Sequence, residues 1–153
     1  DANACPAWGD RCAKSFVHKQ ISETEALVYT LNDLPWPVAN RDVLARVTWK
    51  QHGETLAVEM ESVATDGLMD RNKGVVRLKN AKASWIFTPL ETGRVEVVTL
   101  AHLDPEGPLP GWVTNMLLVD SPFKTLSNMR KVVMEKKYQD AVVSFVQDPV
   151  REN

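Results

Sequence analysis

The sequence is poor in the residues that hold metal ions. It contains two cysteines and three histidines, and none of them lies in a Cys-x-x-Cys or His-x-x-x-His pattern. Because a structural zinc site needs four such ligands, we expect no metal site. The sequence also lacks a glycine-rich phosphate loop and the Gly-x-Ser-x-Gly motif of hydrolases. We therefore expect neither a cofactor nor a nucleophile of that type.

An excess of positive charge and a long hydrophobic run are also lacking. The 18 Lys and Arg residues are balanced by 20 Asp and Glu residues, for a formal net charge of -2. A nucleic-acid-binding protein needs clustered, uncompensated cations, so we expect no nucleic-acid partner. Apolar runs such as Met116 to Val119 are far shorter than the ~20 residues that cross a bilayer. We expect no transmembrane helix.

The composition that remains is that of one globular domain. Of the 153 residues, 44% are hydrophobic and 25% are charged. A chain of this length buries roughly 70% of the surface of its unfolded form, which is enough for a core or an internal ligand cavity. The spacing of Cys5 and Cys12 permits a disulfide without requiring one. The sequence begins at Asp1, and we expect any targeting peptide to lie outside it.

Alternation of apolar and polar residues predicts a largely antiparallel, meandering sheet. In the segment 42–50, for example, Val43, Ala45, Val47 and Trp49 share one face, which we expect to point inward. Short polar connectors separate the predicted strands, as in hairpins. These strands cover residues 15–21, 26–31, 42–50, 55–63, 74–78, 83–90 and 94–103.

A long amphipathic helix is predicted after the Pro- and Gly-rich segment 104–111. It runs toward Val146, and we expect Ser121-Pro122 to kink or interrupt it. Its apolar stripe follows steps of three and four through Trp112, Met116, Val119, Phe123, Leu126, Met129 and Val133. Its basic face carries Lys124, Arg130, Lys131, Lys136 and Lys137.

Two pairs of residues have the chemistry of acids and bases. His102 and Asp104 alternate onto one face at the end of a predicted strand, as do Glu59 and Glu61 in an earlier strand. No nucleophile accompanies either pair. For His102 and Asp104 the simpler interpretation is a hydrogen bond at the rim of the sheet, and for Glu59 and Glu61 it is a sheet face exposed to solvent.

Several segments resemble START (StAR-related lipid-transfer) domains, in particular those of bacteria. They are Asn-Asp-Leu-Pro-Trp-Pro-Val-Ala-Asn-Arg-Asp (32–42), Trp-Ile-Phe-Thr-Pro-Leu (85–90) with Gly93, Leu-Asp-Pro-Glu-Gly-Pro-Leu-Pro-Gly-Trp-Val-Thr-Asn (103–115) and Ser-Pro-Phe-Lys-Thr-Leu-Ser-Asn-Met-Arg (121–130). The resemblance spans nearly the whole chain, but the N-terminal helix and first strands of the family have no counterpart. It implies one START-like domain over residues 1–153 that lacks these elements.

The resemblance implies an α+β helix-grip fold, in which a curved antiparallel sheet wraps around a long C-terminal helix. Between them lies a tunnel for one lipid or other apolar molecule, which is bound and transferred without catalysis. Alternation and this architecture together give the ligand-binding candidates Val43, Ala45, Val47, Val58, Met60, Trp85, Phe87, Val97, Trp112, Met116, Val119 and Leu126.

The resemblance also bears on the ligand and on localisation. Some sterol-binding relatives hold a hydroxyl with a buried acid and base, whereas the matching positions here are Val28 and Val47, which disfavours a sterol. We interpret Arg41-Asp42 as a structural ion pair or rim contact, in preference to a direct contact with the ligand. Similar bacterial proteins look exported, which favours a periplasmic or secreted protein with a Cys5–Cys12 disulfide.

Two other functions remain open, together with two kinds of association. The chain could be a helix-grip enzyme of cyclase or hydrolase type that uses His102 and Asp104, or an interaction module with a filled cavity. The basic helix face could contact a membrane transiently, with opening at Pro122 or in the segment 64–72. Without its first strands, the sheet has an unpaired edge that invites self-association.

Overall fold

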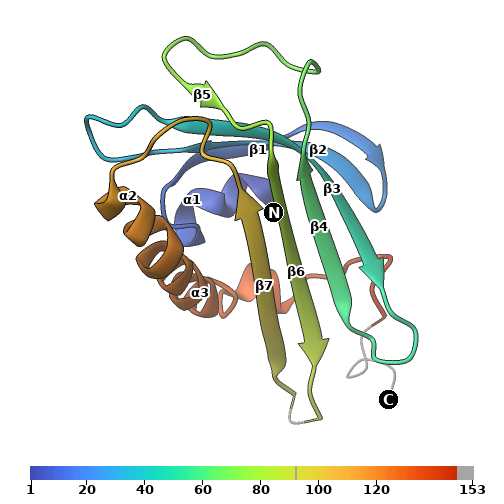
Figure 1. The fold of residues 1–153 in the computed structure, drawn as a ribbon. Coiled ribbons are helices and arrows are strands. Elements are labelled where there is room, and N and C mark those ends of the chain that lie inside the picture. The colour runs from blue at the N-terminus through green and yellow to red at the C-terminus, as the bar shows by residue number, and fades with distance from the viewer. Residues whose placement is uncertain (92, 148–153) are drawn as a thin grey trace.

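The computed structural model describes residues 1–91 and 93–147, and in them the chain forms one sheet and a set of helices on one side of it (Figure 1). The strands are β1 (Cys12–Ser22), β2 (Glu25–Asn32), β3 (Arg41–Gln51), β4 (Val58–Ala64), β5 (Val76–Arg77), β6 (Ala81–Pro89) and β7 (Val95–Leu103). The helices are η1 (Ala2–Ala4), α1 (Cys5–Trp8), α2 (Gly111–Asn115), the π turn η2 (Met116–Asp120), α3 (Ser121–Val132) and α4 (Lys136–Gln139).

The sheet is an antiparallel meander, as its short connectors predicted. Its strand order is β1-β2-β3-β4-β6-β7, and each neighbouring pair is antiparallel. The exception is β5, which lies off this path and pairs in parallel with the start of β3. The α+β helix-grip fold is therefore confirmed, with a curved sheet and a C-terminal helix across it.

The C-terminal helix differs from the prediction in two respects. It continues from Gly111 through Val132, and both Asp120 and Ser121 have helical backbone angles, so the predicted interruption at Ser121-Pro122 is wrong. The proline ring would clash with the carbonyl four residues earlier, that of Leu118, which here lies in the wider π turn.

The helix also ends well before Val146. Glu135 has an extended backbone, with ψ of 139°, and the Gln139 side chain donates a hydrogen bond to the carbonyl of Val133 at 2.7 Å. After α4, the chain folds back toward the tip of the β3–β4 hairpin, where Gln51 bonds Gln147.

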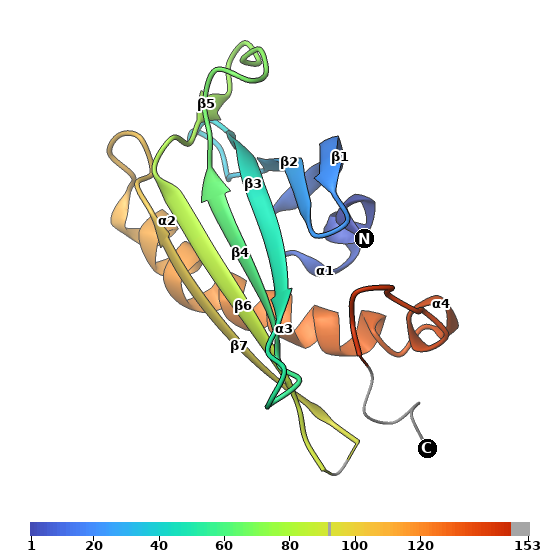
Figure 2. The same ribbon diagram turned by 90° about the vertical axis from the view of Figure 1, so that its right-hand side faces the viewer.

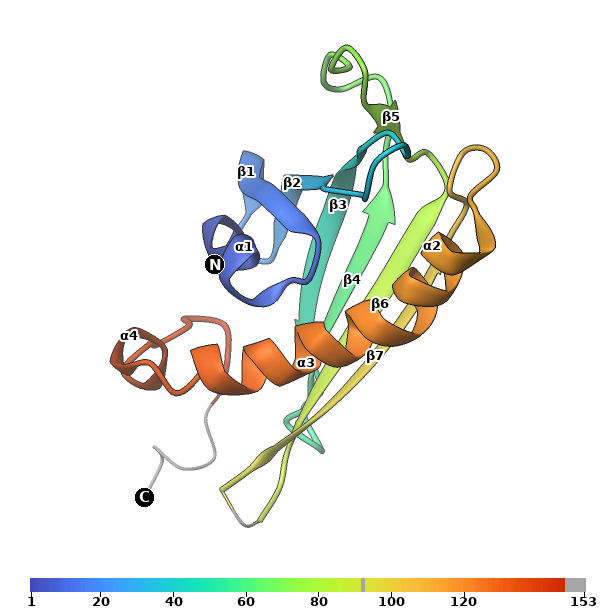
Figure 3. The same ribbon diagram turned by 90° about the vertical axis from the view of Figure 1, so that its left-hand side faces the viewer.

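The two faces of the sheet have different surroundings. Figures 2 and 3 show that α2 and α3 cross one side, which we call the concave face, with α1 beside them. On the opposite, outer face, Leu27, Tyr29 and Leu44 form a buried cluster that Met69 of the connection between β4 and β5 helps to cover. A compact part of the core is therefore on the side away from the helices.

A disulfide joins α1 to the start of β1. Cys5 and Cys12 are bridged, with their Cα atoms 6.0 Å apart. A Cβ on the intervening Gly9 would lie 3.1 Å from atoms of both cysteines, so this tight turn leaves little room for a side chain. The disulfide thereby fixes α1 against the concave face. In the described part of the chain, no helix has the length and apolarity to span a membrane.

Candidate functional site

Strand register assembles an apolar surface on the concave face. Trp49 of β3 pairs with Met60 of β4, which pairs with Trp85 of β6. Because directly paired residues point to the same side, these side chains share one face. Trp85 contacts Trp8 of α1, so that face is the one turned toward the helices.

Aromatic rings form a continuous row over this surface. The ring centroids of Trp8 and Trp85 are 6.1 Å apart in an edge arrangement, those of Trp85 and Phe87 are 6.3 Å apart, and those of Phe87 and Trp49 are 6.4 Å apart. These separations are within the range in which aromatic pairs attract each other. The row links α1 to β6 and β3 and leads to the end of the sheet where the β3–β4 hairpin lies.

A pocket of about 290 Å³ lies at the end of the aromatic row. Gln51 holds one wall in place, since its side chain donates to the carbonyl of Gln147 at 2.9 Å and accepts from the Gln147 N–H at 2.8 Å. The wall is the segment 141–147, which follows α4. The pocket is lined by Gln51, Leu56, Val58, Phe87, Pro89, Val95, Ala141, Val142, Val143, Val146 and Gln147.

The structure places the eight sheet candidates on the concave face. Register aligns Val58 with Phe87 and Phe87 with Val97, and Val47 alternates with Trp49 along β3. The set comprises Val43, Ala45, Val47, Val58, Met60, Trp85, Phe87 and Val97. Of these, Val58 and Phe87 also line the pocket.

The four helix candidates are less uniform. Met116 and Leu126 are half-buried, whereas Trp112 is 53% exposed and Val119 is 66% exposed. The sequence spacing assumed an uninterrupted α-helix, and the π turn at 116–120 rotates the residues that follow it. Ser121 is consequently buried in a position that the apolar stripe did not predict.

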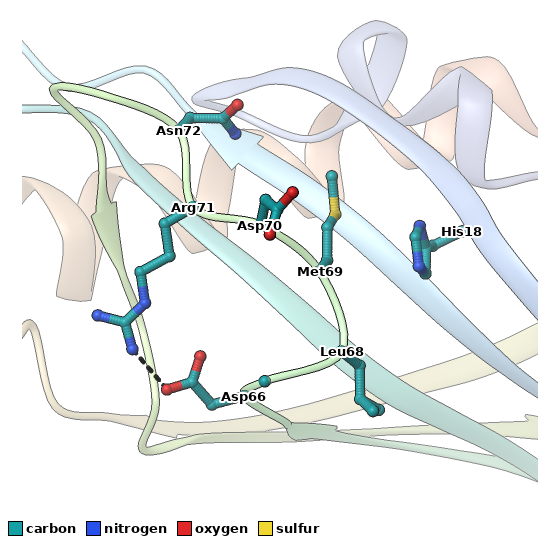
Figure 4. Close-up of a pocket in the computed structure, with 8 residues that line it drawn as sticks. His18, Asp66, Leu68, Met69, Asp70, Arg71 and Asn72 are labelled. Atoms are coloured by element: carbon teal, nitrogen blue, oxygen red, sulfur yellow. Dashed lines mark hydrogen bonds and ion pairs between the residues drawn. The ribbon is translucent and has the colours of Figure 1, made fainter.

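A second, larger pocket lies on the other side of the sheet. It has a volume of about 780 Å³ and is lined by His18 and residues 66–72, as Figure 4 shows. Asp66 and Arg71 form an ion pair within it. Most of these residues belong to one exposed connection and are polar, so this pocket does not suit an apolar ligand.

Beneath that connection, a buried polar network crosses the outer face. The carboxylate of Asp42 accepts hydrogen bonds from the guanidinium of Arg77 at 2.6 and 3.2 Å, from the Tyr29 hydroxyl at 3.1 Å and from Asn72 at 3.1 Å. Burial acts to raise the pKa of Asp42, but the hydrogen bonds from Arg77, Asn72 and Tyr29 outweigh it and hold the pKa below its usual value.

This network corrects the interpretation of Arg41 and Asp42. As neighbours on a strand, they point to opposite faces, and the ion-pair partner of Asp42 is Arg77. Arg41 instead donates to the carbonyls of Ala39 and Pro105, so it connects the loop before β3 to the loop before α2. Sequence reasoning missed Arg77, although an acidic residue buried in a strand requires a cation nearby.

The candidate acid and base residues point away from the concave face. His102 pairs with Lys82 on the outer face and is exposed, so the idea of His102 and Asp104 in the cavity is wrong. On the same outer face, Glu59 lies 3.1 Å from His52, and Glu61 lies 3.1 Å from Lys82. Within residues 1–91 and 93–147, no three His, Cys, Asp or Glu side chains are grouped to hold a metal ion.

Comparisons with known proteins agree with this architecture. A family model described as START domain matches residues 1–138. An uncharacterized protein of Pseudomonas aeruginosa, PA1579, is 28% identical over 136 residues, which are 89% of this chain and 66% of that protein. The chain thus spans just under two thirds of the length of this curated relative.

Solved structures show the same similarity. A fragment of a STAR-related lipid transfer protein from Xanthomonas axonopodis is 34% identical, with a TM-score of 0.76 over 88% of this chain and 75% of that one. Human STARD10 has a TM-score of 0.76 at 21% identity, over 92% of this chain and 56% of that one. Human StAR-related lipid transfer protein 5 has a TM-score of 0.74 at 21% identity, over 87% of this chain and 64% of that one. The two human proteins support the fold alone.

Proposed function

This chain belongs to the START domain family, and on that premise we propose that it binds a lipid or other apolar small molecule between its sheet and its C-terminal helix. The observation that carries the proposal is the aromatic row of Trp8, Trp85, Phe87 and Trp49, which leads to an apolar pocket. Removing apolar surface from water contributes about 25 cal/mol per Å², so binding needs no covalent step.

Exchange of the ligand would take place at a membrane surface. On α2, η2 and α3, Leu118 is 72% exposed and Phe123 is 73% exposed, and Lys124, Arg130 and Lys131 are exposed on the same helix. Apolar side chains next to cations suit the interface of an anionic bilayer. We infer a transient contact through this helix, during which the ligand enters or leaves.

The Cys5–Cys12 disulfide supports a periplasmic or secreted location. Disulfides persist in oxidising compartments and are rare in the cytosol. Protein isolated from its native cell without reductant is expected to contain no alkylatable thiol at Cys5 or Cys12. Two free thiols would contradict this localisation.

The proposal is tested by mass spectrometry of an organic extract of freshly purified protein, beside native mass spectrometry of the intact protein. We expect one apolar molecule per chain. A protein that is empty and also refuses phospholipids, fatty acids, sterols and diacylglycerols would contradict the proposal and favour an interaction module.

A matched pair of variants on β6 locates the site. Phe87→Ala removes a ring from the pocket and should reduce bound lipid by roughly tenfold. Ile86→Ala shortens the adjacent side chain on the outer face, and it should leave lipid binding unchanged. Equal losses in both variants would place the ligand elsewhere.

A further inference from the structure

Charge is distributed very unevenly between the two faces of the sheet. On β3, β4, β6 and β7, the outer face carries the ionisable residues Asp42, Arg46, Lys50, Glu59, Glu61, Lys82, Glu96 and His102. On the concave face of the same four strands, the positions from Val43 onward carry none. Alternation along the strands therefore separates charged from uncharged side chains.

The helices opposite the concave face extend this pattern. The four residues of α1 are Cys, Pro, Ala and Trp, and the most buried residues of α2, η2 and α3 are Val113 and Ser121. All charged residues of the helix 111–132 are exposed; they are Asp120, Lys124, Arg130 and Lys131. The buried side chains of these helices are thus uncharged.

Arg41, Asp10 and Arg11 lie at the border of this space, and each makes a polar contact with the protein itself. Arg41, at the first position of β3, is 8% exposed and donates to the carbonyls of Ala39 and Pro105 under the loop before α2. Asp10 and Arg11, in the turn after α1, form an ion pair with each other at 3.4 Å. The pair is neutral as a unit.

These observations limit the ligand. An ionised headgroup moved into this space would lose its hydration, and the guanidinium of Arg41 at the border already donates to two backbone carbonyls, so the transfer is strongly unfavourable. The polar side chains of the concave face include the hydroxyls of Ser62 and Thr99, which suit a neutral hydroxyl or carbonyl group.

We propose that the ligand is an uncharged lipid, whose polar part is a hydroxyl, ester or amide, and that lipids with an ionised phosphate, sulfate or carboxylate are excluded from the interior. The inference rests on the proposed function and names the class of ligand for that site. Charged lipids are excluded because, in the described part of β3, β4, β6 and β7, the concave face carries no ionisable side chain from Val43 onward.

The test compares two lipids that differ in one charged group. Dioleoylglycerol and dioleoylphosphatidic acid are offered separately in phosphatidylcholine vesicles, the vesicles are removed by flotation, and lipid bound to the full chain is measured by mass spectrometry. We expect at least about tenfold more bound dioleoylglycerol than phosphatidic acid. Equal or greater binding of phosphatidic acid, or stoichiometric phosphatidylcholine, would overturn the inference.

Two variants test the cause directly. Ser62→Lys places a cation on the concave face of β4, and it should raise the ratio of bound phosphatidic acid to dioleoylglycerol at least about fivefold. Ser84→Lys adds the same charge on the outer face of β6, and the ratio should not change. A change of equal size in both folded variants would refute the inference.

The outcomes separate this inference from the proposed function. If the protein binds neither lipid and its extract is empty, the proposed function fails. If it binds charged lipid, the proposed function stands and the inference fails. Should Ser62→Lys not fold, as judged by circular dichroism, the comparison of the two lipids on the unmodified protein still decides.

Discussion

Asp42 joins the polar groups that are buried on the outer face, since it accepts hydrogen bonds from Tyr29, Asn72 and Arg77. Its side chain is 1% exposed, as is that of its partner Arg77. Loss of one member of a buried ion pair leaves the other charge without compensation, so Asp42→Ala should lower the free energy of unfolding by about 3–5 kcal/mol in urea denaturation. Glu61→Ala, which breaks the exposed pair with Lys82, should cost less than about 1 kcal/mol. Similar losses in both variants would contradict this ranking.

Tyr29 makes the free energy of unfolding depend on pH in the alkaline range. Burial first, and then the neighbouring Asp42, raise the pKa of Tyr29 from 10.0 to about 12. The folded protein therefore holds this proton more tightly than the unfolded chain, and the stabilisation is complete below pH 10 and is lost as the pH rises toward 12.

Tyr29→Phe tests this dependence. Between pH 10 and 12, the free energy of unfolding of the unmodified protein should fall by about 2 kcal/mol more than that of the variant. Urea denaturation across this range, with tyrosinate absorbance of the native protein, measures both quantities. Parallel pH profiles would show that Tyr29 is not the group responsible.

Single residues also show how far the sequence could predict the site. The period of two along β3 was enough to place Val43, Ala45 and Val47 on one face, because that period is a property of every strand. The Asp42–Arg77 contact was not predictable from local pattern. It depends on the parallel pairing of β5 with β3, which joins residues 35 apart.

Among the elements, α1 has the strongest covalent constraint. The Cys5–Cys12 disulfide ties it to β1, and the N–H of Asp10 donates to the Thr125 hydroxyl of α3 at 3.0 Å. Replacing both cysteines with serine removes a short-loop cross-link and should cost about 2–3 kcal/mol in urea denaturation. Trp8 would then be less firmly held against Trp85, and the variant should also bind lipid more weakly. Unchanged stability and binding would assign the disulfide no structural role.

The C-terminal helix shows why element boundaries were harder to predict than element types. Apolar spacing predicted a helix after residue 110 correctly, but it assumed 3.6 residues per turn throughout. The π turn at 116–120 changes which residues face inward, and nothing in the apolar spacing marks it. The end at Val132 depends in part on the Gln139 side chain, which returns to the carbonyl of Val133.

For the whole molecule, the edge strand β7 predicts self-association. It is last in the strand order, and the outer-face residues Val98 and Leu100 are 44% and 67% exposed. Analytical ultracentrifugation of this chain should show a concentration-dependent dimer that Leu100→Lys weakens at least about tenfold. Leu68→Lys, at a 50% exposed site in the connection between β4 and β5, is the matched control. A monomer at all concentrations would rule out pairing through this edge.

The sheet has its buried ion-pair network on one side and its apolar row on the other. Substitutions that reshape the concave face leave Asp42, Arg77, Tyr29 and Leu44 untouched. At the half-buried positions of the concave face, ligand preference can therefore diverge through evolution with little penalty in foldability, because the ion-pair network lies on the opposite surface of the same strands. For protein engineering, these positions are suitable targets for saturation mutagenesis, with the buried Ala45 and Val47 and the outer face left as they are.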